Sequence, residues 1–187
     1  MAFQDDSNTF PPLDSSVRLG ETPVDLYIKQ VEPHTKEGKN SWKLTVEILA
    51  PETLDVGGKT HMASGVSFIT YVSLNKANFQ YKFGLFNLLA ACGYKRGWDS
   101  DSPYGVFDKE GNTVNVPFTG KVVRAVINTQ ASERKSYEEL SEAEKAAGTK
   151  PKLVVVKDDK GQPVIQHQLR IVEWLGQSNI TPPGSNF

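Results

Sequence analysis

The pattern that most constrains this fold is the alternation of apolar and polar side chains over residues 41–49. Trp42, Leu44, Val46 and Ile48 share one parity, and the polar Lys43, Thr45 and Glu47 share the other. A period of two residues places successive side chains on opposite faces of a β-strand. The sequence therefore predicts a strand here with one buried face.

Four further stretches are predicted to be strands, and one is predicted to be a buried helix. The other strands are expected at residues 24–32, 65–74, 120–129 and 164–174. Ile165, Leu169 and Ile171 are expected to point inward from the last of these strands. The helix is expected at 78–92, because its apolar residues, Ala90 among them, fall near helical spacing. Asn75 or Asn78 is expected to cap its start, and Gly93 is suited to follow its end.

Proline and glycine mark the expected turns between the first strands. Pro33 is predicted to end the first strand, and the polar residues 34–40 are predicted to form a hairpin loop. Residues 50–64 contain Gly57 and Gly58 and are predicted to be a turn-rich connection.

A long insertion is expected between the fourth and fifth strands, at residues 130–163. It is predicted to contain a short charged helix at 136–147, capped by Ser136 with Glu139 three residues further on. Residues 153–156 are expected to form one strand of a projecting hairpin.

The resulting order is three strands, one helix, a fourth strand, the insertion and a fifth strand. This order predicts a mainly β protein, a five-stranded Greek-key barrel of the oligonucleotide-binding (OB) class. A β-sandwich would need about seven strands, and an α/β sheet would need alternating helices. We expect a flexible N-terminal arm at 1–23, the OB domain at 24–175 and a flexible C-terminal tail at 176–187.

The charge of the chain permits a nucleic-acid partner without favouring one strongly. The net charge is −1, whereas proteins that bind nucleic acids usually carry a basic surface. The charge is uneven, because residues 24–130 hold 12 Lys and Arg against 10 Asp and Glu, giving +2.

Other sequence features argue against several functional classes. Cys92 is the single cysteine, so no intrachain disulfide can form. The chain shows neither a signal peptide nor an apolar run of the roughly 18 residues that a membrane span needs. We expect a soluble, cytoplasmic protein (in the host cytoplasm if a phage encodes it) with no membrane partner.

No motif for catalysis, a metal or a cofactor is present in the sequence. It lacks a P-loop, a dinucleotide-binding glycine motif, a zinc-protease motif and a nucleophile elbow. His34 and His61 are expected to be solvated loop residues, and His167 is expected at the core or its rim. We therefore expect no enzymatic activity and no cofactor.

A surface suited to unpaired nucleic acid is predicted on the second and third strands. Ile69 and Tyr71 lie on the face of the third strand that should meet water, beside Lys43 and flanked by Lys36 and Lys39. Single-strand binding combines cations along the phosphates with rings on which bases stack. The predicted DNA-binding set also includes Trp42, Lys121, Arg124, Arg134, Lys135 and Tyr137.

These residues also have purely structural interpretations. Tyr71 could be covered by the 130–163 insertion, and the parity of Trp42 favours burial. The lysines could be solvated charges that discourage aggregation. Tyr137 could pack the short helix against its hairpin.

The chain resembles phage-encoded single-stranded DNA-binding proteins with an OB fold. The resemblance rests on a Lys/Gly loop and Trp-led strand at 34–49, a leucine-rich helix followed by glycine at 86–94, and residues 118–123. It implies that the protein coats single-stranded DNA in phage replication or recombination, with replication or recombination proteins and further copies of itself as partners. Many such proteins end in an acidic tip, but no acidic residue occurs from Gly176 onward.

A second interpretation is a viral structural or assembly protein that uses a barrel and arms for subunit contacts. The near-neutral charge, the leader containing scattered apolar residues and the long insertion favour it. Loss of oligonucleotide binding at low salt would favour this alternative, since phosphate binding depends on counterion release.

Overall fold

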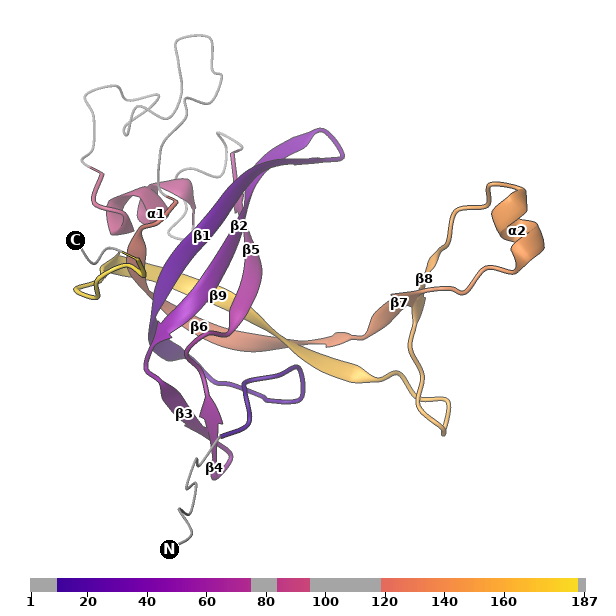
Figure 1. Cartoon of the computed structure of the whole chain (residues 1–187), viewed down its shortest axis with the longest axis horizontal. Coiled ribbons are helices and arrows are strands. Elements are labelled where there is room, and N and C mark those ends of the chain that lie inside the picture. The colour runs from indigo at the N-terminus through magenta and orange to yellow at the C-terminus, as the bar shows by residue number, and fades with distance from the viewer. Residues whose placement is uncertain (1–9, 75–83, 95–118, 185–187) are drawn as a thin grey trace, which may run out of the picture.

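The computed structural model describes residues 10–74, 84–94 and 119–184, and it is built around one five-stranded antiparallel sheet (Figure 1). The strands of this sheet are β1 (Thr22–Lys36), β2 (Lys39–Ala50), β5 (Ser67–Ser73), β6 (Val122–Glu133) and β9 (Ile165–Gln177). The remaining elements are β3 (Thr53–Val56), β4 (Lys59–Met62), α1 (Leu85–Ala91), β7 (Lys135–Tyr137), α2 (Glu142–Ala146) and β8 (Leu153–Val155). The predicted mainly β class is confirmed.

The five strands pair in the order β5-β2-β1-β6-β9, which leaves β5 and β9 at the two edges. The sheet curves so that these edges approach each other, although no ladder of hydrogen bonds joins them in the described residues. The five predicted core strands correspond to these five strands in sequence order.

The core lies on the concave side of this sheet and under α1. The alternation predicted for β2 is confirmed, because Trp42, Leu44, Val46 and Ile48 are all buried. Side chains of β1, β6 and α1 complete the cluster, among them Leu26, Ile28, Leu85, Leu88, Leu89, Val123 and Ile127.

The first hairpin is longer and its turn tighter than predicted. β1 continues through Pro33 to Lys36, and only Glu37 and Gly38 form the turn, both at positive φ. Pro33 does not end the strand, because β1 is paired to β6 only as far as Tyr27. Beyond Tyr27 it is an edge strand among the described residues, where proline is tolerated. The predicted 34–40 loop is therefore mostly a paired, projecting β-ribbon.

The connection predicted at 50–64 contains a hairpin of its own. β3 pairs with β4 around Gly57 and Gly58, which take φ values of 60° and 78°. Two consecutive residues at positive φ give the tight turn that suits a two-residue hairpin. The glycines were correctly associated with a turn, but the short strands on either side were missed.

The described part of the expected N-terminal arm packs against the sheet. Leu13, Val17 and Leu19 are buried in the core cluster. The Leu13 N–H donates to the Met62 carbonyl at 3.0 Å, and the Thr129 N–H donates to the Leu19 carbonyl at 3.0 Å. Residues 10–19 are therefore docked rather than loosely held, because their apolar side chains have a core to enter.

Helix α1 begins at Leu85, with Gly84 as its N-cap. The residues predicted to cap the helix, Asn75 or Asn78, lie outside the described residues. The C-terminal prediction is confirmed: Gly93 has a φ of +87°, and Tyr94 donates its N–H to the Leu89 carbonyl. This bond and the one from Gly93 to Ala90 satisfy the last carbonyls of the helix. Ala90, predicted to be buried, is exposed.

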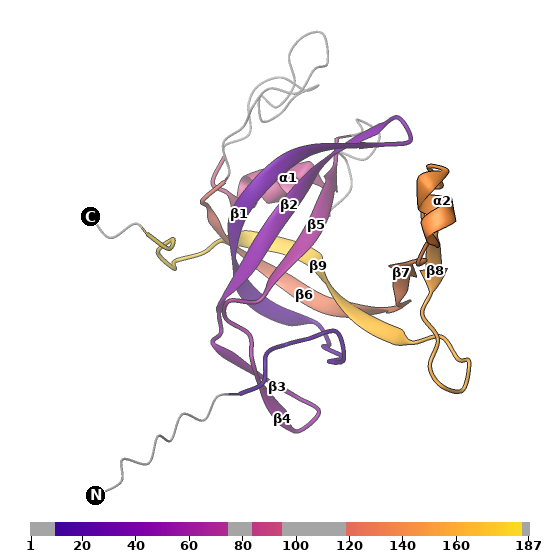
Figure 2. The same cartoon turned by 45° about the vertical axis from the view of Figure 1, so that its right-hand side comes forward.

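The insertion forms an arm that projects from the far ends of β6 and β9 (Figures 1 and 2). β7 and β8 pair as a projecting hairpin, as predicted. The helix prediction was misplaced: Ser136 lies in β7, and α2 is only Glu142–Ala146. Ser141 and Glu144 form its capping box. They repeat the Ser-x-x-Glu pattern of Ser136 and Glu139, five residues further along the chain.

The last strand differs from prediction at its start. Ile165, predicted to point inward, is exposed, whereas Trp174 is buried. Ile165 pairs with Glu133 at the end of the β6–β9 ladder from which the arm projects, beyond the core against which Leu169 and Ile171 pack. A register shift between Ile171 and Glu173 changes the parity of β9, so that Trp174 points inward. The strand continues to Gln177, beyond the predicted end of the domain at residue 175. In the described ranges, no helix combines the length and apolar character needed to span a membrane.

Candidate nucleic-acid interface

The outer face of β5 carries two neighbouring apolar side chains that are open to solvent. Tyr71 is 55% exposed and Ile69 is 48% exposed. Their cross-strand partners on β2 are Lys43 and Thr45. The buried Leu44 and Val46 of β2 point to the opposite face of the sheet. The core therefore holds in place the strands that carry Ile69 and Tyr71.

His34 adds a second ring to this face. Its ring centroid lies 5.0 Å from that of Tyr71, with the planes tilted by 51°. His34 was expected in a solvated loop, but it lies within β1, opposite Ser41. The sequence could not place it beside Tyr71, because the contact requires the extension of β1 past Pro33 and the β1–β2–β5 register.

A hollow of about 610 Å³ opens beside these rings, along the end of the β1–β2 ribbon that carries its turn. Its lining includes His34, Tyr71, Lys36 and Lys39. We call the surface formed by His34, Lys36, Lys39, Lys43, Ile69 and Tyr71 the trough. The Tyr71 ring thus lies in the same hollow as Lys36 and Lys39.

The charges of the trough are mixed. Lys43 pairs with Glu32 at 3.3 Å, and nearby Lys29 pairs with Glu47 at 2.7 Å. No ion pair of Lys36 or Lys39 occurs among the described residues. These two ammonium groups are therefore the strongest candidates for phosphate contacts, while Glu37 between them weakens the local field.

A second hollow, of about 520 Å³, lies between the two sheet edges. β5 contributes Ile69 and Tyr71 to its lining, and β9 contributes His167 and Gln168. Tyr71 lines both hollows, so the trough continues past this ring into the space between β5 and β9. The half-buried His167 agrees with its predicted place at the core rim.

Three residues of the predicted set lie away from the exposed part of the trough. Trp42 is only 8% exposed and belongs to the core. Arg124 lies opposite Asp25 of β1, before the ribbon begins to project. The Lys121 carbonyl accepts the Ile28 N–H at 2.9 Å, which places Lys121 at the same distant part of the sheet.

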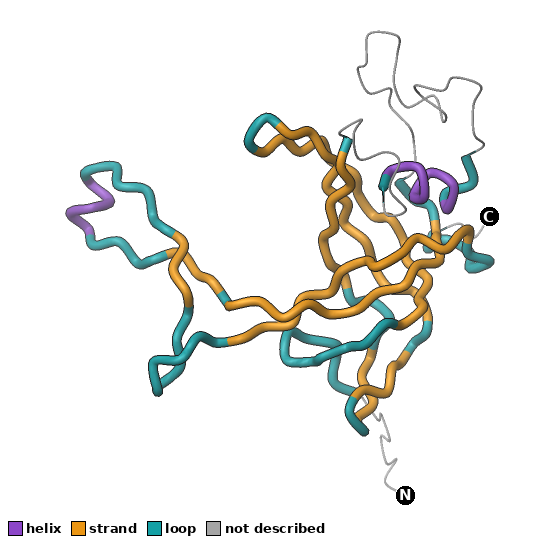
Figure 3. Tube along the Cα trace, turned by 180° about the vertical axis from the view of Figure 1, so that it is seen from behind, coloured by secondary structure: helices purple, strands orange, loops and turns teal. Residues whose placement is uncertain are grey.

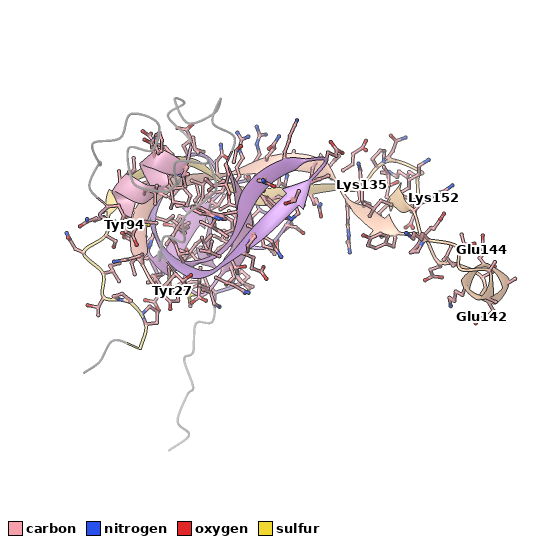
Figure 4. All side chains as sticks on the ribbon, turned by 90° about the horizontal axis from the view of Figure 1, so that it is seen from above. Tyr27, Tyr94, Lys135, Glu142, Glu144 and Lys152 are labelled. Atoms are coloured by element: carbon pink, nitrogen blue, oxygen red, sulfur yellow. The ribbon has the colours of Figure 1, made fainter. Side chains whose placement is uncertain are left out.

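Arg134, Lys135 and Tyr137 belong to the arm. Arg134 separates β6 from β7, and its backbone exchanges hydrogen bonds with Val164 and Val156. Figure 4 shows Lys135 at the start of the arm, with Lys152 further out and Glu142 and Glu144 at its end. Seen from behind, the arm and the β1–β2 ribbon project as separate extensions (Figure 3).

Cys92 and His61 line neither of the two hollows. Burial raises the pKa of the Cys92 thiol to about 12, which keeps it protonated near neutral pH. His61 is half-buried in β4 rather than solvated in a loop, and its Nδ1 is buried without a hydrogen-bond partner among the described residues. Across residues 10–74, 84–94 and 119–184, no three His, Cys, Asp or Glu side chains gather into a metal-binding group.

No protein-family model matches the chain, and no significant match to it is found among curated proteins or solved structures.

Proposed function

We propose that this protein is a non-enzymatic, largely sequence-independent binder of single-stranded DNA. The observation that carries the proposal is the exposure of Tyr71 and Ile69 on a rigid sheet face, beside Lys36 and Lys39. Bases stack on exposed rings whatever their identity, and lysines attract the phosphates between them. Duplex DNA buries its bases, so it cannot use the rings in this way.

We propose further that the sheet is an OB barrel. Supporting this are the pairing of β1 with both β2 and β6, the approach of the edges β5 and β9, and a helix between β5 and β6. The Greek-key OB barrel binds its ligand on the second and third strands and on the loops after the first and fourth strands. The trough and the arm occupy the corresponding parts of this chain.

The setting that we propose is phage DNA replication or recombination, in the cytoplasm of the host. This rests on the sequence resemblance alone, as do replication or recombination proteins as partners and self-association. The proposed binding of DNA does not depend on this setting.

Salt dependence of oligonucleotide binding tests the proposal. A fluorescent oligothymidine should bind at about 50 mM salt and weaken roughly 20-fold by about 200 mM, because three lysine contacts give a slope near −2 in log K against log salt. Fluorescence anisotropy measures both affinities, with a duplex of equal length as the control competitor. Absence of binding by micromolar protein at the lower salt would remove the proposal.

The second candidate is a viral structural or assembly protein. It is favoured by the exposed apolar side chains of the arm, Tyr137, Leu153 and Val154, which are suited to contact another subunit. Sedimentation without DNA separates the two: assembly through the arm predicts oligomers that Leu153→Asp disperses, whereas the leading proposal requires no such change.

A further inference from the structure

The hollow between β5 and β9 has the size and lining of a site for one nucleobase. Its volume of about 520 Å³ falls in the usual range for small-molecule sites. Much of its wall is apolar, formed by Leu13, Val66, Phe68, Ile69 and Leu169. Asp14, Ser15 and Gln168 supply polar groups within this wall.

The docked leader holds Asp14 at this hollow. On one side of Asp14, the Leu13 N–H donates to the Met62 carbonyl of β4. On the other side, the Ser15 carbonyl accepts the His167 N–H of β9 at 2.7 Å. Asp14 is thus held between two backbone anchors on different strands, which limits the positions its carboxylate can take.

The Asp14 side chain presents an ionised acceptor. Its Oδ1 accepts hydrogen bonds from the Ser16 hydroxyl and, at 2.8 Å, from the Ser16 N–H, which lower the pKa of the carboxyl group. None of the described hydrogen bonds reaches Oδ2. An anionic acceptor repels phosphate, so this end of the hollow favours a base edge rich in donors over the DNA backbone.

Guanine is the base whose edge fits this acceptor. Its N1–H and N2–H₂ groups are adjacent donors, which the two open lone-pair sites of Oδ2 can accept together. Thymine presents one donor between two carbonyl acceptors, and adenine and cytosine each present an amine donor beside a ring-nitrogen acceptor. A carboxylate facing any of these three bases would meet a lone pair as well as a donor.

We propose that the cleft between β5 and β9 receives one base of the bound strand and prefers guanine through the Asp14 carboxylate. Tyr71 connects this cleft to the trough, so a base stacked on its ring is followed by one that can enter the cleft. This inference rests on the proposed single-strand binding and adds a single base preference to it.

The test compares oligothymidine of about 12 nucleotides, within the usual site size, with the same strand carrying one central guanine or one central adenine. Anisotropy titrations should show the guanine strand binding about fivefold more tightly, near the low end for a bidentate base contact. The adenine strand should bind like oligothymidine.

Asp14→Asn keeps an oxygen for the Ser16 bonds but replaces one acceptor with an NH₂ donor. It should bring the guanine-to-thymine affinity ratio close to one while leaving oligothymidine binding intact or tighter. Asp55→Asn is the matched control: it removes the same charge from β3, where Asp55 accepts the Thr60 hydroxyl at 2.6 Å. That variant should retain the ratio.

The outcomes separate this inference from the proposed function. Oligothymidine binding without a guanine advantage overturns the inference and leaves the proposed function standing. A guanine advantage that persists in Asp14→Asn also overturns the inference, because the Asp14 carboxylate then does not cause the preference. Failure of every strand to bind removes the proposed function, and this inference with it.

Discussion

The trough and the arm both present an exposed tyrosine next to lysines, yet they are built differently. Tyr71 lies on a sheet whose other face is packed core, and the His34 ring lies beside it. Tyr137 is 66% exposed on a hairpin in which every residue of β7 is exposed. Helix α2, at the end of the same arm, has no buried residue.

The comparison shows that an exposed ring is not necessarily a preorganised one. A ring held by a folded sheet loses little conformational freedom when a base stacks on it, whereas a ring on a marginal two-stranded ribbon must be ordered at that moment. α2 relies on local bonds, since Ser141 and Glu144 cap it reciprocally. We therefore expect the trough to dominate DNA binding and the arm to contribute little to the stability of the core.

The largest expected effect that tests this comparison is on stability. Leu44→Ala should lower the free energy of unfolding by about 2–5 kcal/mol, because it leaves a cavity beneath the trough. Leu44 is fully buried, whereas Leu153 of β8 is 58% exposed. Leu153→Ala should change stability by no more than about 0.5 kcal/mol.

Urea unfolding followed by the fluorescence of the buried Trp42 and Trp174 measures both variants. A loss above about 1.5 kcal/mol for Leu153→Ala, larger than is usual for an exposed site, would show that the arm is packed against something. The contrast between the two regions would then be wrong.

The sequence predicted the trough better than it predicted the arm, for a physical reason. The period of two in β2 and β5 follows directly from strand geometry, so the parity of Trp42, Ile69 and Tyr71 could be read without knowing their neighbours. The core then required Trp42 to be buried and left Tyr71 outside. The arm has no buried face, so its sequence contains no periodicity to locate it.

Features that depend on long-range pairing were missed. Proline usually indicates the end of a strand. Pro33 is accommodated within β1 because β1 is not paired to β6 beyond Tyr27. Burial of Leu13 and Val17 depends on a groove that other segments create. Ser136 and Ser141 both begin a Ser-x-x-Glu pattern, and the pairing of β7 with β8 assigns Ser136 to a strand.

The next expected effect is on affinity and compares the two tyrosines. Tyr71→Ala should weaken oligothymidine binding about tenfold, since stacking contributes roughly 1–3 kcal/mol per base. Tyr137→Ala should weaken it by less than about twofold, because a ring on an exposed two-stranded hairpin loses more conformational freedom when a base stacks on it. Anisotropy at fixed low salt measures both.

Tyr71→Phe is the control for this pair, because it retains the ring and should bind within about twofold of the unaltered protein. Thermal unfolding by circular dichroism should be nearly unchanged for Tyr71→Ala. A large loss of thermal stability with full affinity would mean that the ring serves the fold and not the ligand.

The smallest expected effect concerns the lysines. Replacing Lys36 and Lys39 together with Gln should reduce the salt slope from about −2 to about −0.7, since each phosphate contact adds about −0.7. Lys150→Gln with Lys152→Gln removes the same charge from the arm and should leave the slope within about 0.3 of its original value. Net charge is therefore matched, and position alone differs.

A salt titration of all three proteins with one oligonucleotide decides between local and diffuse attraction. If replacing Lys150 and Lys152 lowers the slope as much as replacing Lys36 and Lys39, the arm contacts phosphates. The sequence-based prediction that Arg134, Lys135 and Tyr137 bind DNA would then be supported. If only replacing Lys36 and Lys39 lowers the slope, the cations that matter are those beside Tyr71, because screened surface charges act over about 10 Å at ordinary salt. The trough then suffices to explain how a chain with a net charge of −1 holds a polyanion.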